Sequence, residues 1–384
     1  MLKAEPGIYH GCKPADYFKL GVVREDGSII ERGSSEYIMS RSSLRDFARC
    51  PQAWQLGLPR KASKAFAWGS LIDGMLLTPD MLDELIVVQP ETYSNAPEKG
   101  RFILSTEFDG EWNPRTKACR EWKKEKESMG WKIYTPEQYA EACEEKKWNA
   151  NSDYCKKWIE SVPAEVDVIS SGMMAEAEKA MLRIEEDVRF SHILGISQTQ
   201  TVIVWDWTCP VSGEIIRCKA MLDIVPPAET GVLLDLKTTV DAHPVAWSHH
   251  VKKYGYHYQG AMYMDGYNAA ADAMGQDDYR DTFGHLIQES SAPYETARRV
   301  LENDWITVGR VEYEADLMRY ATCRVTGNFP GYSENTEDGF ERVECPSYLR
   351  PAAEQKRMDA QDEALDIDAK WQNSAAEEEE VCHG

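Results

Sequence analysis

The stretch Met221–Thr239, MLDIVPPAETGVLLDLKTT, places two aspartates and a lysine in two apolar segments. The apolar segments predict two short strands, and the prolines and glycine between them predict a turn. Because side chains alternate along a strand, Asp235 and Lys237 point to the same side. A hairpin through residues 226–231 brings Asp223 across from Asp235. We therefore expect two carboxylates and one ammonium close together on one sheet surface.

Two carboxylates beside a lysine suit a magnesium site. Mg²⁺ takes oxygen ligands, commonly binds protein through one or two carboxylates, and keeps several waters. A nearby lysine can hold an attacking water and stabilise charge on a phosphate, and the Thr238 hydroxyl can bond a phosphate oxygen. A surface salt bridge is the alternative interpretation of D-x-K. The metal site is favoured because an unpaired charge in an apolar setting is unfavourable, and the neighbours are Leu222, Ile224, Leu233, Leu234 and Leu236.

Two motifs in this order resemble a known nuclease superfamily. Asp223 followed by Asp235-x-Lys237 resembles the core of the PD-(D/E)xK superfamily. Downstream, Gln259-Gly-Ala-Met-Tyr263 resembles the Q-x-x-x-Y helix motif of its RecB-type branch. Over roughly residues 6–335 the order of motifs is similar to phage-borne nuclease domains of the exodeoxyribonuclease VIII (RecE) type. The resemblance implies an α/β fold of the restriction-endonuclease-like kind, with a mixed twisted central sheet flanked by helices.

The resemblance also implies a set of metal ligands. Asp223 and Asp235 would bind Mg²⁺ together with the backbone carbonyl of Leu236, and Mn²⁺ could substitute. The branch pattern Gly-x-x-x-His occurs here as Gly69-x-x-x-Asp73. An aspartate can ligate a hard cation, so Asp73 is a further candidate ligand. Loss of the histidine could equally mean a weakened nuclease, and Asp73 could simply be a polar residue at a helix turn.

The remaining motif residues would act on water or on DNA. Lys237 would orient the attacking water. Gln259 and Tyr263 lie one helical turn apart and would hold a DNA phosphate or the lysine. Arg217 and Lys219 alternate onto the same strand face as Asp223. We therefore expect both cations, with Thr238, to contact DNA.

The composition opposes a simple DNA-binding protein. The 384 residues contain 43 Lys and Arg against 65 Asp and Glu, a net charge of −22, whereas a protein that binds a polyanion usually has a basic surface. Basic side chains can still line a local channel. The ten cysteines are scattered without a C-x-x-C pair, which is typical of reduced thiols in a cytoplasmic protein. Some relatives bind an iron–sulfur cluster through a cysteine like Cys50, but the late cysteines lack the matching cluster, so none is expected.

The sequence predicts one large domain and a tail. Residues 1–345 are expected to form the nuclease domain, with a helical insertion at about 90–190. Residues 346–384 are polar and acidic and predict a flexible tail. Within the insertion, Thr135-Pro136 predicts a helix start with proline in the first turn. No signal-peptide pattern or membrane-spanning apolar run is evident, so a cytoplasmic protein of a bacterium or an infected host is expected.

The favoured hypothesis is a Mg²⁺-dependent exonuclease that hydrolyses linear double-stranded DNA during phage-type recombination or DNA processing. The resemblance further implies a homo-oligomer that acts on duplex ends beside a single-strand annealing recombinase. The alternative is a catalytically weakened, nuclease-like protein that binds DNA ends or a partner, motivated by Asp73 and by Met221, where relatives often carry arginine. A third hypothesis is an adaptor whose acidic surface mimics DNA.

Overall fold

The computed structural model describes residues 4–57, 64–163, 166–332, 340, 343–345, 347, 351 and 354–361. The chain divides into two compact units, Met1–Phe329 and Pro330–Gly384. In the second unit, residues 354–361 are helical. Most of the expected tail lies outside the described residues, so the predicted boundary after residue 345 stays a prediction.

A mixed seven-stranded sheet forms the centre of the first unit, in the order β1-β9-β10-β11-β12-β13 with β2 also beside β10. The β2–β10 and β11–β12 pairs are parallel and the other pairs are antiparallel. This mixed sheet confirms the expected fold class. The strands are β1 Gly7–Tyr9, β2 Met39–Ser40, β9 Gln198–Thr208, β10 Ile215–Val225, β11 Val232–Thr239, β12 Thr282–Glu289 and β13 Thr296–Val300.

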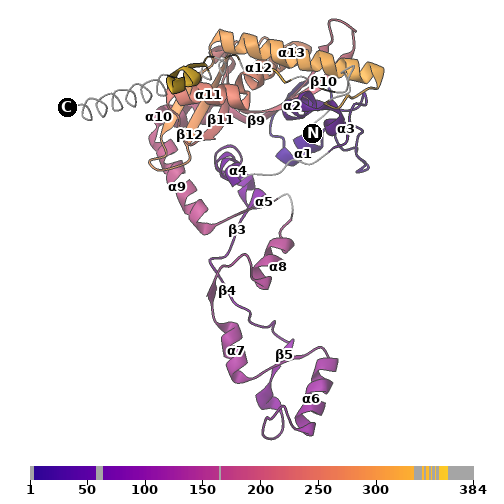
Figure 1. Cartoon of the computed structure of the whole chain (residues 1–384), viewed down its shortest axis with the longest axis vertical. Helices are drawn as coiled ribbons and strands as arrows, with labels where there is room; N and C mark the ends of the chain where they lie inside the picture. The colour runs from indigo at the N-terminus through magenta and orange to yellow at the C-terminus, as the bar shows by residue number, and fades with distance from the viewer. Residues whose placement is uncertain are drawn as a thin grey trace, which may run out of the picture. The chain divides into compact units, whose positions relative to one another are not determined.

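Helices cover both faces of this sheet (Figure 1). Their apolar side chains form two cores with those of the strands. The larger core lies under α2 Arg41–Arg49, α3 Pro51–Gln55, α11 Pro244–Tyr254, α12 Tyr256–Ala273 and α13 Asn303–Thr326. The second core lies under α4 Lys64–Leu77, α9 Ser171–Glu186 and α10 Val188–Ile196. A sheet buried on both faces needs apolar side chains at successive positions, which explains the apolar runs at residues 202–205 of β9 and 232–234 of β11.

Strands β10 and β11 separate in the middle of the sheet. Their register pairs Ile224 with Leu234, which places Asp223 opposite Asp235 as the sequence predicts. Further back along β10, Cys218 and Lys219 pair with β2 instead of β11. Because β2 occupies the place beside β10 there, β11 must turn away after Asp235. The ladder between these two central strands is therefore interrupted beyond the Ile224–Leu234 pair, and we call this interruption the gap. Helix α4 contacts β11 there, and α12 contacts β10.

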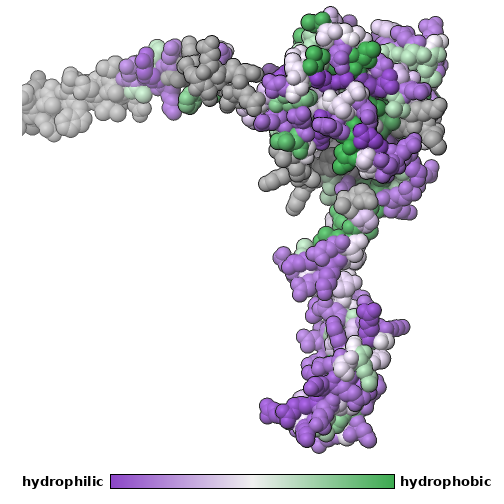
Figure 2. Space-filling view, turned by 90° about the vertical axis from the view of Figure 1, so that its right-hand side faces the viewer, coloured by the Kyte–Doolittle hydropathy of each residue, from purple (hydrophilic) through white to green (hydrophobic). Residues whose placement is uncertain are grey.

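The segment between α4 and α9 contains paired strands as well as helices. The sequence predicts a helical insertion; the difference arises because strands of two or three residues are too short to show an alternating pattern. Mostly hydrophilic side chains cover this segment (Figure 2). Its elements are α5 Leu82–Leu85, β3 Ile86–Val88, β4 Thr92–Tyr93, β5 Phe102–Leu104, α6 Lys117–Ser128, β6 Lys132–Tyr134, α7 Pro136–Cys143, β7 Lys146–Lys147, α8 Asp153–Ser161 and β8 Asp167–Ile169. The strand pairs are β3–β8, β4–β7 and β5–β6.

The N-terminal segment adds α1 Pro14–Lys19, whose Tyr17 is buried near β10. No helix of the described residues is long and apolar enough to cross a membrane.

Candidate active site

Asp223 lies at the point where β10 and β11 separate. Its Oδ2 accepts a hydrogen bond from the backbone N–H of Leu236 at 3.0 Å, where a continuous ladder would supply a β10 carbonyl. Burial, followed by the neighbouring Asp235 carboxylate, raises the pKa of Asp223. The strand separation thus leaves a carboxylate in the gap whose charge is poorly compensated.

Asp235 is the most enclosed of the acidic groups, with 2% of its surface exposed. Its Oδ1 accepts a hydrogen bond of 2.7 Å from Gln259 Nε2, and its Oδ2 forms an ion pair with Lys237. Burial alone would raise the pKa of Asp235, but the charge and hydrogen bond of the Lys237 ammonium outweigh burial and lower it. Asp235 is therefore ionised and fixed in orientation by two partners.

Lys237 points to the same side as Asp235, as the alternation of β11 predicts. Its Nζ donates to the Leu236 carbonyl at 3.2 Å and lies 5.3 Å from the centre of the Tyr256 ring. Burial acts to lower the pKa of Lys237, but Asp235 and Asp223 raise it above the usual range. The lysine is therefore charged, and it contacts two of the groups that the sequence assigns to a metal.

Helix α12 brings Gln259 and Tyr263 to the larger-core side of the gap. Gln259 is 6% exposed and holds Asp235 directly. Tyr263, one turn later, is half-buried beside Gln259, and burial followed by the Asp235 charge raises its pKa. A neutral phenol at this place can donate to an anionic oxygen.

Helix α4 brings Asp73 to the same gap from the opposite layer. Burial raises the pKa of Asp73 to about 7; Lys237 acts to lower it and Asp235 to raise it further. One turn earlier in α4, Gly69 packs against β11, with Thr238 Oγ1 3.5 Å from where a Gly69 side chain would begin. This close approach of helix to strand allows Asp73 to reach the carboxylates of the sheet.

The gap thus gathers three carboxylates, a backbone carbonyl and a single lysine. Hard oxygen donors of this kind are what Mg²⁺ and Mn²⁺ bind. Within the described ranges, however, no three His, Cys, Asp or Glu side chains stand close enough together to hold a metal ion as they are. Lys237 contacts Asp235 and the Leu236 carbonyl, and Leu236 N–H holds Asp223. The donor set fits a divalent ion in its chemistry, and filling it requires the lysine to give up one contact.

Arg217 and Lys219 serve the N-terminal segment instead of the gap. Lys219 is 3% exposed, and its Nζ donates to the Tyr17 and Leu20 carbonyls at 2.7 Å each. Arg217 forms hydrogen bonds of 2.8 and 2.9 Å with Asp206. This corrects the expectation that both cations contact DNA, because their charged groups are already bound by protein.

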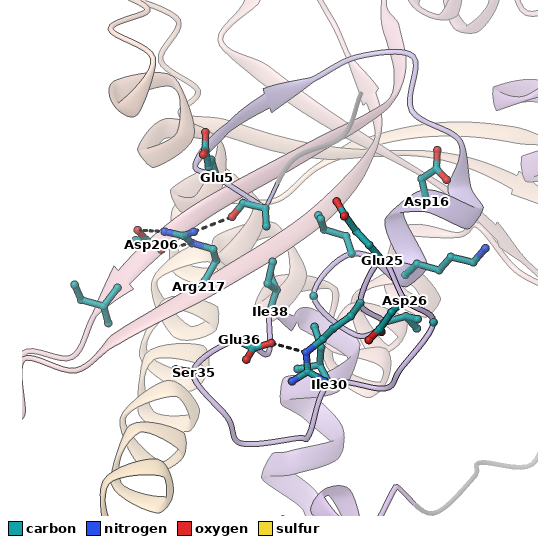
Figure 3. A pocket seen from close by; sticks show the side chains of 18 residues that line it. Glu5, Asp16, Glu25, Asp26, Ile30, Ser35, Glu36, Ile38, Asp206 and Arg217 are labelled. Atoms are coloured by element: carbon teal, nitrogen blue, oxygen red, sulfur yellow. Dashed lines mark hydrogen bonds and ion pairs between the residues drawn. The ribbon is translucent and has the colours of Figure 1, made fainter.

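Arg217 also lines a pocket of 1630 Å³ on the N-terminal segment, which contains none of the other predicted site residues. Figure 3 shows Arg217 directed at Asp206. Several further carboxylates lie around the pocket in the same view. The acidic side chains of the lining outnumber the basic ones: Glu5, Asp16, Glu25, Asp26, Glu36 and Asp206 against Lys19, Arg24 and Arg217. Such an acidic lining does not fit a polyanion.

Two residues of the gap were not found from the sequence. His285 pairs with Asp235 across β11 and β12, is fully buried, and has no hydrogen-bond partner on either ring nitrogen. Burial lowers its pKa to about 4, so the ring is neutral. Arg41, the first residue of α2, lies near Asp235 and Tyr263 and has a buried Nε without a partner. No local signal marks either residue, because the parallel β11–β12 register and the position of α2 are set by long-range packing.

Comparison with known proteins identifies one family. Residues 136–338, somewhat more than half of the chain, match the family described as "PDDEXK-like domain of unknown function (DUF3799)". No curated protein matches the chain. Ten chains of solved structures match. One is a protein from Eubacterium rectale provisionally named an exonuclease, with a TM-score of 0.42 and 15% identity over 80% of this chain and 90% of that chain. Another is SSO0001, with a TM-score of 0.23 and 13% identity over 43% of this chain and 68% of that chain.

Proposed function

The chain belongs to the family of PDDEXK-like domains, and on that premise we propose that it is a metal-dependent deoxyribonuclease. The observation that carries the proposal is the strand gap, where Asp73, Asp223, Asp235 and Lys237 come together from α4, β10 and β11. Three carboxylates lie near Lys237 and Arg41, so acidic groups outnumber basic ones in the gap. A cation supplied from solution relieves that excess, which is why a metal-dependent activity suits the gap better than a purely structural role.

Asp223, Asp235 and the Leu236 carbonyl would hold a Mg²⁺ ion, with Asp73 as a further ligand. Such an ion would supply Lewis-acid chemistry for phosphodiester hydrolysis. The family generally uses divalent metals, and Mg²⁺ is the ion we propose here, with Mn²⁺ as a substitute. Gln259 keeps the Asp235 carboxylate in one orientation through its 2.7 Å hydrogen bond.

Lys237 would orient the attacking water and stabilise charge on the scissile phosphate. Its ammonium is charged and already lies between the Asp235 carboxylate and the Leu236 carbonyl, so a small rotation directs it toward a bound phosphate. Tyr263 keeps its proton at neutral pH and can donate it in a hydrogen bond to a phosphate oxygen. These are transition-state contacts, and loss of one such donor commonly lowers the rate about a hundredfold or more.

For the substrate we propose the ends of linear double-stranded DNA, cleaved as an exonuclease in recombination or DNA processing. This finer proposal rests on the resemblance to RecE-type domains, as do an oligomer and a recombinase partner. The strand gap itself supports phosphodiester hydrolysis, whichever end or strand is used.

The test is cleavage of linear and circular plasmid DNA by the purified full chain with Mg²⁺, Mn²⁺ or EDTA. Wild type should shorten linear DNA only with metal, and Lys237→Ala should lower the rate at least about a hundredfold. The matched control is Lys156→Ala, an exposed lysine on α8 outside the gap, which should still cut. Equal cleavage with and without Lys237 would refute the proposal.

A second candidate function is DNA binding without cleavage. The ion pair between Lys237 and Asp235 favours it, because this pair leaves one carboxylate oxygen less available to a metal. Asp73 also favours it, since it stands where the family pattern Gly-x-x-x-His has histidine. Such a protein would retain linear DNA in a gel-shift assay yet leave it intact at every Mg²⁺ and Mn²⁺ concentration. Cleavage that depends on Asp235 would exclude it.

A further inference from the structure

Helix α2 and the end of α11 carry five cations: Arg41, Arg45, Arg49, Lys252 and Lys253. The two elements are joined directly, because Arg41 and Arg45 both donate to the backbone carbonyl of Tyr254. Throughout the described part of the chain, none of the ion pairs involves these five cations. In a chain with 65 acidic residues and 43 basic ones, five cations without a carboxylate partner on two adjoining segments suit an anionic ligand.

An aromatic row leads from the catalytic lysine to these cations. The Tyr256 ring lies 5.3 Å from Lys237 Nζ, and the Tyr254 ring lies 5.7 Å from Tyr256. Tyr254 is 43% exposed. Its position is fixed because its carbonyl is held by two arginines, and Lys253 Nζ lies 5.1 Å from its ring centre. The partly exposed Tyr254 ring therefore lies next to charged side chains. Only the Tyr256 ring stands between it and Lys237 in this row.

We propose that Arg45, Arg49, Lys252, Lys253 and Tyr254, the strand surface, bind an unpaired DNA strand beside the scissile phosphate. The cations would contact phosphates, and one base would stack on Tyr254. This inference rests on the proposed nuclease function and adds the state of the substrate: single-stranded where it enters the gap. Bases in a duplex stack on each other and offer no free face, whereas an unpaired base can cover an exposed ring.

Acidic groups also lie near the strand surface. Asp316 is close enough to Arg45 to interact, but its Oδ2 already accepts a hydrogen bond of 3.0 Å from the Tyr258 hydroxyl. Glu312 is bound to His257 at 3.0 Å. Both acidic groups are thus engaged with α12, and Arg49, Lys252 and Lys253 remain exposed.

The first test measures how binding of an oligonucleotide depends on salt. The full chain in EDTA, where no metal-dependent cleavage occurs, is titrated against a fluorescent 15-nucleotide oligo-dT and a blunt duplex of about the same length at several salt concentrations. Because each phosphate contact on single-stranded DNA contributes about 0.7 to the salt slope, Lys252→Gln/Lys253→Gln should lower that slope by about 1.4. The matched control is Lys156→Gln/Lys157→Gln, another pair of adjacent exposed lysines, on α8, which should leave the slope unchanged.

The second test concerns stacking. Tyr254→Ala should weaken oligo-dT binding about tenfold or more, and Tyr254→Phe, which keeps the ring, should stay within about twofold of wild type. Duplex binding should change less than oligo-dT binding in the alanine variant. Equal oligo-dT affinity for Tyr254→Ala and wild type, equal slopes for the two lysine pairs, or no binding of oligo-dT by wild type would each overturn the proposal.

A cleavage assay with Mg²⁺ separates this inference from the proposed function. Wild type that binds oligo-dT through the strand surface but never cuts DNA would refute the nuclease and leave the strand surface intact. If wild type cuts DNA, and Lys252→Gln/Lys253→Gln and Tyr254→Ala both cut and bind normally, the nuclease proposal stands and the strand surface is refuted. Far-ultraviolet circular dichroism of each variant identifies a failure to fold. If Tyr254→Ala does not fold, the salt slope of Lys252→Gln/Lys253→Gln against that of wild type decides the proposal.

Discussion

Asp73→Asn is expected to stabilise the metal-free protein while it lowers cleavage. The Asp73 carboxylate is buried in a gap that holds two further carboxylates and one lysine, and burial raises its pKa to about 7. In the unfolded chain an aspartate has a pKa of about 3.9. Between about pH 4 and pH 7 the native state therefore binds the proton more tightly than the unfolded state. Stability falls as the pH rises through this window, and above it the ionised carboxylate destabilises the fold fully.

The size of the effect follows from the shift. A rise of about three pKa units corresponds to about 4 kcal/mol at 1.36 kcal/mol per unit. Asp73 is only half-buried and solvent screens part of its charge, so the expected gain for Asp73→Asn at pH 8 is about 2 to 4 kcal/mol. At pH 4, where Asp73 is protonated in the native state, the two proteins should have nearly equal stability.

Urea unfolding in EDTA at pH 8 and pH 4 measures this difference. The matched control is Asp277→Asn, an exposed aspartate, which should change stability by less than about 0.5 kcal/mol. Adding Mg²⁺ at pH 8 should stabilise wild type more than Asp73→Asn, because ligand binding to the native state adds to its stability. If Asp73→Asn is no more stable than wild type at pH 8 in EDTA, the reasoning that the gap holds uncompensated charge is wrong.

Three further changes test the packing around the site. Asp187 caps α10 and its pKa is lowered to about 2 by hydrogen bonds from Thr296 and Arg298 that outweigh burial, so Asp187→Ala should lose about 2 kcal/mol at pH 7. That loss should shrink between about pH 4 and pH 2 in urea unfolding; a constant loss would contradict the linkage. His285→Phe should leave the Tm equal or higher, because neither ring nitrogen has a partner, and a fall of more than about 5 °C would reveal a hidden one. Gly309→Ala on α13 would place a Cβ 2.2 Å from a backbone oxygen of α12, so a loss of about 2 kcal/mol or more is expected, and an unchanged Tm would contradict the close packing.

Local patterns determined the elements and the chemistry of the gap. The D-x-K alternation of β11 and the turn before it predict that Asp223 opposes Asp235, and the Ile224–Leu234 register agrees. Thr135-Pro136 predicts the start of α7, which carries a capping box. These features depend on neighbours within a few residues, where backbone geometry leaves few alternatives.

Long-range packing decided what surrounds those residues. The alternation of β10 places Lys219 on the same strand face as Asp223. It does not predict that carbonyls at the end of α1 accept hydrogen bonds from the Lys219 ammonium. The separation of β10 from β11 exists because β2, almost 180 residues earlier in the chain, pairs with β10. Long-range packing likewise positions α2 so that Arg41 lies near the gap, and the parallel β11–β12 register places His285 beside Asp235. The sequence by itself determined which groups bear the charge. Only the tertiary structure decided which of those charges meet, because burial and pairing depend on segments that no local pattern connects.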